Sequence, residues 1–269
     1  MSFQSSSRRL LLPIVTIAVA VTVLTAFPNT KQTSGGYLSQ NNPRKKSDEM
    51  VMPIVNYDDS VIDNELSASP QLKSPEVRSL RNARYDNKVW VQDLEQRSQV
   101  LSTNHWWSGL SALPVVHSDA IVFGEVIGAQ AYLSNDKSGV YSEFRIRVDE
   151  VLQAHKSVPL ATGGIVVGER AGGAVRFQSG HVTQYFYLGQ GFPRIGSRYV
   201  FFLKMNESGQ DFHILTGYRL GREKVQALDQ KDIFAQYEGY DRDGFFSDLR
   251  EAIARSRREE KSNEINSPF

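Results

Sequence analysis

Five histidines are the side chains of this sequence best suited to acid–base chemistry, because imidazole titrates near neutral pH. They are spread along the chain as His105, His117, His155, His181 and His213. No two of them stand four residues apart, so none forms the paired ligand set of a helical zinc site. A histidine-based site would have to assemble across strands, and His117, His181 and His213 are the first candidates for it.

Two other groupings match known motifs only in part. Ser134 and Lys137 have the serine-to-lysine spacing of penicillin-recognising enzymes, but that motif needs a helix and two partner motifs that this sequence does not offer. The glycine-rich residues 189–196 are similar to a phosphate-binding loop, yet a strand is expected after them, so no helix N-terminus would supply the anion-binding dipole. We interpret both as turns or loops.

Acidic residues offer no better site. Residues 241–244 are similar to part of a calcium-binding loop, but Gly239 and Arg250 stand in the positions of its first and last ligands, so helix capping is the better interpretation. Glu143 and Glu150 fall on a strand whose charged face is expected to be solvated. The sequence therefore assigns no catalytic residue, no metal ligand and no cofactor.

Composition narrows the classes of protein further. The chain has no cysteine, which excludes thiol nucleophiles, disulfides, thiolate zinc sites and a lipid-modified cysteine. Its 31 Lys and Arg nearly balance its 30 Asp and Glu, so no net field attracts nucleic acid, and no nucleic-acid partner is expected. The apolar fraction of 40% is sufficient for a folded core within 269 residues.

The N-terminus predicts export from the cytoplasm. Arg8 and Arg9 precede residues 10–27, which carry no charge and would extend about 27 Å as a helix, close to the thickness of a bilayer core. Leu24 and Ala26 form a poor cleavage site, because a small residue is wanted at both positions. We therefore expect residues 1–27 to be a signal or anchor segment, with the N-terminus inside and the bulk of the chain outside.

The export route stays open. Two adjacent arginines before a hydrophobic run resemble the twin-arginine signal, although Pro13 stands where that signal often has lysine. A basic lead to a general secretory signal is the other interpretation, and the sequence agrees with both.

Residues 28–114 are rich in Ser, Asn, Gln, Lys and Pro, and we expect them to form a polar, largely disordered linker. Within this range, 87–101 has spaced apolar residues that suggest a short helix. Trp106 and Trp107 are expected to cover one end of the folded domain that follows, although exposed tryptophans can also stack on carbohydrate.

Residues 115–228 predict a mainly β domain, a small antiparallel OB-like barrel. In 141–152, Phe144, Ile146 and Val148 alternate with charged residues, which is typical of a half-buried strand. The turn formers 135–139 join this run to the preceding one as a hairpin, and 171–173 predict a second tight hairpin. The expected strands are 120–128, 141–152, 164–169, 174–177, 182–187, 199–204, 212–216 and 223–227.

The C-terminal part changes to a helical period. Asp241 or Asp243 can cap a helix whose apolar stripe includes Phe245, Leu249 and Ile253. We expect residues 229–262 to be a helical segment that packs on the barrel, and 263–269 to be a disordered tail.

Three stretches carry a resemblance to a known family. Residues 118–126, which read S-D-A-I-V-F-G-E-V, together with 143–152 and 196–203, resemble secreted OB-like barrel domains, including the netrin-like and metalloprotease-inhibitor modules. They are also similar to bacterial envelope proteins of that plan. The resemblance implies the barrel fold, but the inhibitors act through an N-terminal cysteine that this chain lacks, so no functional residue is transferred.

These observations favour a membrane-tethered or secreted binding module of the cell envelope over an enzyme. Its expected partners are another envelope protein and, through the N-terminal segment, the membrane. The alternative is an envelope hydrolase whose site assembles across strands from the histidines named above. A third possibility is a permanent structural part of a larger envelope complex.

Overall fold

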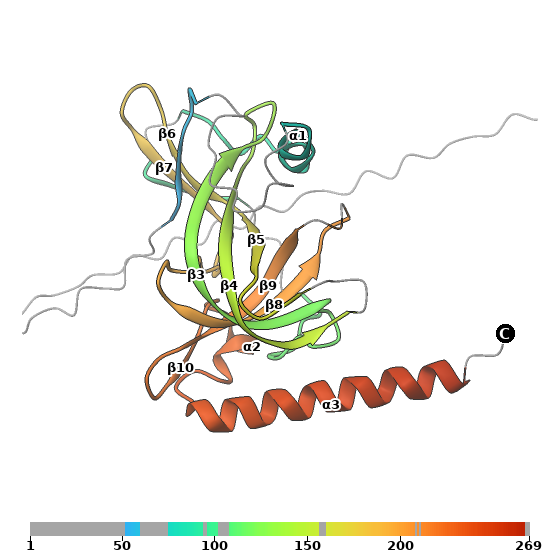
Figure 1. Cartoon of the computed structure of the whole chain (residues 1–269). Coiled ribbons are helices and arrows are strands. Elements are labelled where there is room, and N and C mark those ends of the chain that lie inside the picture. Colours follow the sequence, from blue (N-terminus) through green and yellow to red (C-terminus); the bar gives the residue numbers. More distant parts are fainter. Residues whose placement is uncertain are drawn as a thin grey trace, which may run out of the picture. The chain divides into compact units, whose positions relative to one another are not determined.

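The computed structural model describes residues 52–59, 75–93, 96–101, 108–155, 160–207, 209 and 211–266. Over these residues the chain is mainly β, with a long C-terminal helix (Figure 1). The strands are β1 (Ile54–Asn56), β2 (Ser98–Val100), β3 (Ala120–Leu133), β4 (Val140–Ala154), β5 (Ile165–Ala171), β6 (Gly173–Arg176), β7 (Val182–Phe186), β8 (Arg198–Met205), β9 (Phe212–Leu220) and β10 (Val225–Ala227). The helices are α1 (Pro75–Ala83), α2 (Asp232–Ala235) and α3 (Arg242–Asn266).

The long β3–β4 hairpin forms where the sequence predicts it. Its turn is held by side chains, because the Ser134 hydroxyl accepts a hydrogen bond from the Gly139 amide and Asp136 accepts one from the Ser138 amide. Lys137 takes a left-handed backbone conformation, with φ of 57°, to close the turn. All eight strands expected after residue 115 are present, with ends shifted by a few residues.

The larger sheet closes on itself. β3 pairs with β4 and β8, β4 with β5, β5 with β9 in parallel, and β9 with β8, so the hydrogen-bonded ladder returns to its first strand. Figure 1 shows β3 and β4 curving together across this ring. Their pairing contains register shifts, and such irregularities bend strands. The ring order is β3-β4-β5-β9-β8, and β10 adds to β9 outside it.

A smaller sheet has the order β1-β6-β7-β2. The expected hairpin at 171–173 is wrong, because β5 belongs to the ring whereas β6 pairs with β1 and β7. Gly172, with φ of 98°, lies where the chain leaves one sheet for the other.

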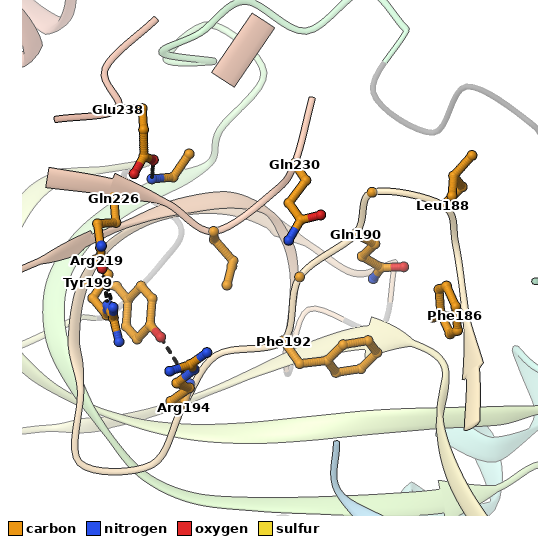
Figure 2. A pocket seen from close by; sticks show the side chains of 14 residues that line it. Phe186, Leu188, Gln190, Phe192, Arg194, Tyr199, Arg219, Gln226, Gln230 and Glu238 are labelled. Carbon is orange, nitrogen blue, oxygen red and sulfur yellow. Dashed lines mark hydrogen bonds between the residues drawn. The ribbon is translucent and has the colours of Figure 1, made fainter. Parts of the chain in front are cut away.

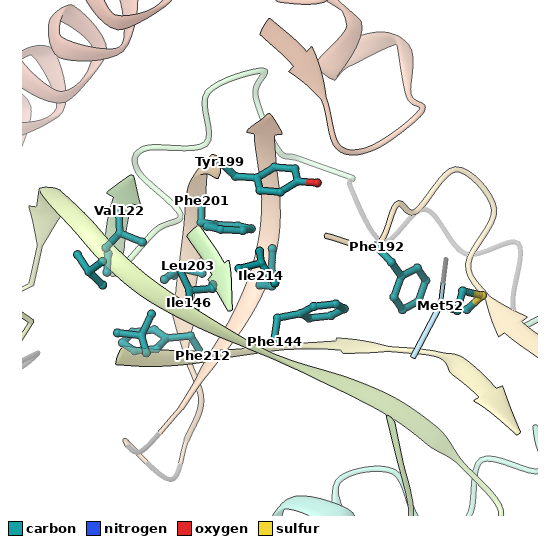
Figure 3. Close-up of a cluster of buried hydrophobic side chains, with 14 of the residues drawn as sticks. Met52, Val122, Phe144, Ile146, Phe192, Tyr199, Phe201, Leu203, Phe212 and Ile214 are labelled. Atoms are coloured by element: carbon teal, nitrogen blue, oxygen red, sulfur yellow. The ribbon is translucent and has the colours of Figure 1, made fainter. Parts of the chain in front are cut away.

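The main apolar cluster lies among the ring strands. Phe144 and Ile146 come from β4, Phe201 from β8 and Ile214 from β9, and all are buried. Figure 3 shows Phe144, Phe201 and Ile214 directed toward the space between the strands. The alternation of apolar residues in the β4 sequence therefore faces the core as predicted.

Helix α3 packs on the ring through the stripe that its sequence predicts. Phe245, Leu249 and Ile253 are buried against residues of β8 and β9, among them Phe202 and Tyr218. Asp241 accepts a hydrogen bond from the Gly244 amide at 2.8 Å and so caps the helix, which confirms the capping interpretation. The helix continues to Asn266, so the expected disordered tail is wrong for residues 263–266.

The described part of the expected linker is folded. β1, α1 and β2 all lie within residues 28–114, and Met52, Val55 and Tyr85 are buried. All described residues belong to the unit Asp48–Phe269. The helix suggested over 87–101 is absent from the described residues of that range, where 98–100 form a strand instead. The prediction of a largely disordered linker is wrong for these described residues, because it overlooked contacts that the short elements make with distant strands.

The N-terminal segment, residues 10–27, lies outside the described residues, as do Trp106, Trp107 and His105. Among the helices that the structure describes, none is long and apolar enough to cross a membrane.

Candidate functional site

Helix α1 is held to the ring by buried arginines. Arg78 and Arg81 on α1 and Arg84 just after it recur every three residues, which brings their side chains to one side of the helix. The three described buried side chains of α1 are Arg78, Arg81 and Asn82, all of them polar. A helix with such a buried face needs partners of opposite charge.

Three carboxylates from the ring supply those partners. Arg78 binds Glu143 of β4 through two hydrogen bonds of 2.6 and 3.1 Å. Arg81 contacts the same carboxylate at 2.7 Å and Asp211, directly before β9, at 2.9 Å. Arg84 contacts Asp211 at 2.6 Å and Glu169 of β5 at 2.5 Å. We call these six residues the ion cluster; its charges balance, which lowers the cost of burying them.

Tyrosines complete the ion cluster. The Tyr141 hydroxyl donates to the Asn82 side chain at 2.6 Å and accepts from Arg78 at 3.0 Å. The Tyr85 hydroxyl donates to Glu169 at 3.0 Å, and its ring stacks on Tyr141 with 4.4 Å between centroids. Burial raises the pKa of both phenols well above the ordinary range, so both stay protonated donors at neutral pH.

Two carboxyls of the ion cluster have shifted pKa values. Burial, reinforced by the nearby negative charges of Asp211 and Glu143, raises the pKa of Glu169 from 4.5 to about 7 and outweighs the lowering effect of Arg84. Burial also opposes ionisation of Asp211, but hydrogen bonding from Arg84 and the charges of Arg81 and Arg84 lower its pKa overall. Glu169 is therefore the member of the cluster that can exchange a proton near neutral pH.

A second buried ion pair fixes the glycine-rich loop 188–194 to the ring. Arg170 of β5 forms two hydrogen bonds with Asp229, of 2.5 and 2.9 Å. Asp229 also accepts from the Thr216 hydroxyl and the Gly191 amide, each at 2.8 Å. Gly191 approaches the chain so closely that an added Cβ would lie 1.9 Å from the Leu228 carbonyl oxygen. The loop sequence thus serves close packing rather than phosphate binding.

The first cavity lies against this loop, has a volume of about 480 Å³, and is called the loop cavity below. Figure 2 shows Phe186, Leu188, Gln190 and Phe192 on one side of it, and Tyr199, Arg219 and Gln226 on the other. Three of its polar side chains are engaged, since Arg219 donates to the Gln226 amide oxygen and Glu238 accepts from the Ala227 amide. The walls combine aromatic rings with amide side chains, a composition typical of small-molecule sites.

The second cavity has a volume of about 370 Å³ and lies beside the ion cluster. Its apolar wall includes Trp90 and Tyr187, whose rings meet edge to face at 6.0 Å. Arg84, Lys88 and His213 line it as well, and we call it the basic cavity. It is a mixed apolar and cationic site.

Gln190 is shared by the two cavities. Only 8% of the residue is exposed, and its side-chain oxygen has no hydrogen-bond partner among the described residues. A buried amide oxygen without a donor is costly, by about 1–3 kcal/mol. The oxygen has almost no exposed surface, so a molecule bound in either cavity would reach it only after the Gln190 side chain turns toward that cavity.

The structure places the candidate histidines at different positions. His117 is exposed in the turn before β3, and His181 lies 2.9 Å from the Gln96 carbonyl oxygen. His213 on β9 lies at the rim of the basic cavity, with its Nδ1 atom 3.6 Å from Glu169. His155 is exposed at the end of β4. Among the four described histidines, only His213 therefore combines a cavity with a neighbouring carboxylate.

The other sequence candidates have local roles or none. The Lys137 ammonium binds the Tyr57 carbonyl oxygen at 2.6 Å, and Ser134 is part of the hairpin turn, so neither is placed for penicillin-type chemistry. Glu150 is exposed as expected, but the expectation that Glu143 is solvated is wrong, since it is the central acceptor of the ion cluster. The described residues contain no group of three or more potential metal ligands.

Sequence reasoning missed the ion cluster because its arginines lie in the expected linker. The recurrence of arginine every three residues over 78–84 was the one available signal, since it puts like charges on one helical face. The carboxylates gave no such signal, because each stands alone on a different segment.

No protein-family model matches this chain, and no curated protein matches it either.

Proposed function

We propose that this chain is an extracytoplasmic binding module of the cell envelope, tethered to the membrane by residues 10–27 or secreted after their removal. The observation that carries the proposal is the pair of cavities that meet at Gln190, with apolar walls and a buried, unpaired acceptor. The charge-free run after Arg8 and Arg9 supports export from the cytoplasm.

The fold that we propose for the module is an OB-like barrel. The ring joins its strands in the order first, second, third, fifth, fourth, with the third and fifth parallel. This order supports the resemblance to the secreted OB-like domains seen in the sequence. Because cysteine is absent, the module does not use the cysteine-based mechanism of the inhibitor members of that group.

The partner that we propose is another envelope protein. The membrane contact runs through the N-terminal segment alone, and nucleic acid is not a partner, since the net charge is only +1. The Leu188 side chain at the rim of the loop cavity is 55% exposed, which offers an apolar contact for such a partner.

Site-specific photo-crosslinking tests this role. A photo-reactive residue at position 188 of the full chain, expressed in cells, should crosslink to an envelope protein, and excess untagged chain should compete with it. The matched control is position 116, because Val116 is also exposed, at 72%, but lines neither cavity. Equal crosslinking at both positions, or none at either, would refute the binding role. Protease digestion of intact spheroplasts tests the proposed location, because a module outside the cytoplasm should be cleaved and one inside should be protected.

A second candidate function, an envelope hydrolase, is favoured by one observation. His213 stands at the rim of the basic cavity beside the buried Glu169, an arrangement in which the carboxylate can orient an imidazole that activates water. Turnover of an ester, amide or phosphoester that falls by about 100-fold or more in His213→Gln but persists in His117→Gln would establish this function in place of the first. A full substrate panel without turnover would exclude it.

A further inference from the structure

The lining of the basic cavity is rich in basic side chains, of which His213 is neutral at neutral pH because burial lowers the pKa of its imidazole. Four basic residues contribute to it, Arg84, Lys88, Arg170 and His213, and its described lining contains no carboxylate. Two of these basic side chains form ion pairs with carboxylates outside the cavity lining: Arg84 contacts Glu169 and Asp211, and Arg170 contacts Asp229.

Lys88 differs from the two arginines. It is exposed, its ammonium lies 6.0 Å from the centroid of the Trp90 ring, and no described carboxylate pairs with it. The charge of Lys88 is thus available to an anion that enters the cavity.

The remaining wall suits an apolar body. Trp90 and Tyr187 form an edge-to-face aromatic pair, and Leu110, Ile214 and Leu215 line the cavity with them. The volume of about 370 Å³ lies within the usual range for small-molecule sites. One aromatic group up to the size of an indole, with short substituents, is a matching occupant.

Gln190 indicates a third chemical group of the ligand, a hydrogen-bond donor. Its buried side-chain oxygen has no donor among the described residues, and once the side chain turns toward the cavity this oxygen would accept a hydrogen bond from a neutral ligand N–H or O–H. An ammonium group would also satisfy this oxygen, but the charge of Lys88, which no described carboxylate balances, opposes it.

We propose that the basic cavity binds a small aromatic carboxylate that carries a neutral hydrogen-bond donor, with N-acylated aromatic amino acids as the simplest members of this class. The carboxylate contacts Lys88, the ring lies against Trp90 and Tyr187, and the amide N–H donates to Gln190. This assignment rests on the proposed binding function and adds the class of ligand.

Calorimetric titration of the full chain, reconstituted in nanodiscs, tests the assignment. N-acetyl-tryptophan should bind saturably with one site. N-acetyl-tryptophanamide, which keeps the ring and the donor but loses the charge, should bind at least tenfold more weakly, and zwitterionic tryptophan should also bind at least tenfold more weakly. No saturable heat with N-acetyl-tryptophan, or equal affinity for its amide, overturns the proposal.

Two variants locate the site. Lys88→Met should weaken binding of N-acetyl-tryptophan about tenfold, whereas Lys224→Met, which removes an exposed lysine outside both cavities, should leave it unchanged. Gln190→Leu should weaken binding at least fivefold without lowering the thermal midpoint, since it removes an unpaired buried acceptor. Equal affinity in the wild type and Lys88→Met overturns the assignment even where Gln190→Leu fails to fold.

The titration and the crosslinking experiment fail independently. Competed crosslinking at position 188 without saturable titration would overturn the ligand class alone. Loss of both would overturn the binding function as well.

Discussion

The substitution Glu143→Gln tests whether the ion cluster holds α1 to the ring. Glu143 is 6% exposed and accepts hydrogen bonds from Arg78 and Arg81, both of them buried. Removing its charge leaves two buried guanidinium groups short of a counter-ion, and breaking a buried ion pair in this way typically costs about 3–5 kcal/mol. We expect the free energy of unfolding to fall by about that amount.

The matched control is Glu125→Gln on the neighbouring strand β3. Glu125 contacts Arg147 at 2.6 Å, a distance like that of the buried pair, but the Arg147 side chain is 47% exposed. Because exposed ion pairs contribute only about 0–1 kcal/mol, this variant should be almost as stable as the wild type. The two substitutions make the same chemical change, so they isolate the effect of burial.

Urea unfolding followed by tryptophan fluorescence measures both variants. With a denaturant dependence of about 2 kcal/mol per molar urea, Glu143→Gln should lower the unfolding midpoint by about 1.5–2.5 M, and Glu125→Gln by less than about 0.5 M. A midpoint shift for Glu143→Gln no larger than that of the control would refute the conclusion that the ion cluster fixes α1.

Three further predictions concern the described residues. The pKa of Glu169 is raised from 4.5 to about 7, so the folded state binds its proton more tightly than the unfolded state; its contribution to stability is present below pH 4.5 and is lost as the pH rises through 7. Between pH 5 and 8 the wild type should lose up to about 3 kcal/mol relative to Glu169→Gln, measured by urea unfolding at each pH, and parallel pH profiles would contradict this. Gly191→Ala should lower stability by about 1–3 kcal/mol or more, because the new Cβ would clash with the Leu228 carbonyl, whereas Gly128→Ala meets only ordinary contacts at 3.6 Å and should have a smaller effect on the thermal midpoint. Phe144→Ala should lower the free energy of unfolding by about 3–5 kcal/mol in urea unfolding, since the Phe144 side chain is fully buried inside the closed sheet. A loss below about 1 kcal/mol would place this side chain outside the core.

Much of the β structure was predictable because its signal is local. In β4 the alternation of Phe144, Ile146 and Val148 with charged residues specifies both the strand and its buried face. The turn at 134–139 joins β3 to β4 through side-chain hydrogen bonds within six residues, and Asp241 caps α3 in the same local way. Such features depend on neighbours along the chain and can be inferred without knowing the fold.

The candidate site was predictable only in small part. His213 was among the three histidines proposed for a cross-strand site, but the sequence could not separate it from His117 and His181, which lie elsewhere. Gln190 gave no signal, because its unpaired oxygen becomes apparent only when the loop is folded against both cavities.

The sequence by itself determined the strands after residue 115, the capped C-terminal helix and the absence of any cysteine chemistry. Only the tertiary structure decided that α1 belongs to the folded unit, because its buried face is charged and gives no apolar periodicity. The partners of that face are remote in sequence: Arg81 meets Glu143 across 62 residues and Arg84 meets Asp211 across 127. Ion pairs of this kind depend on which strands close the ring, and that closure is a property of the whole chain rather than of any segment.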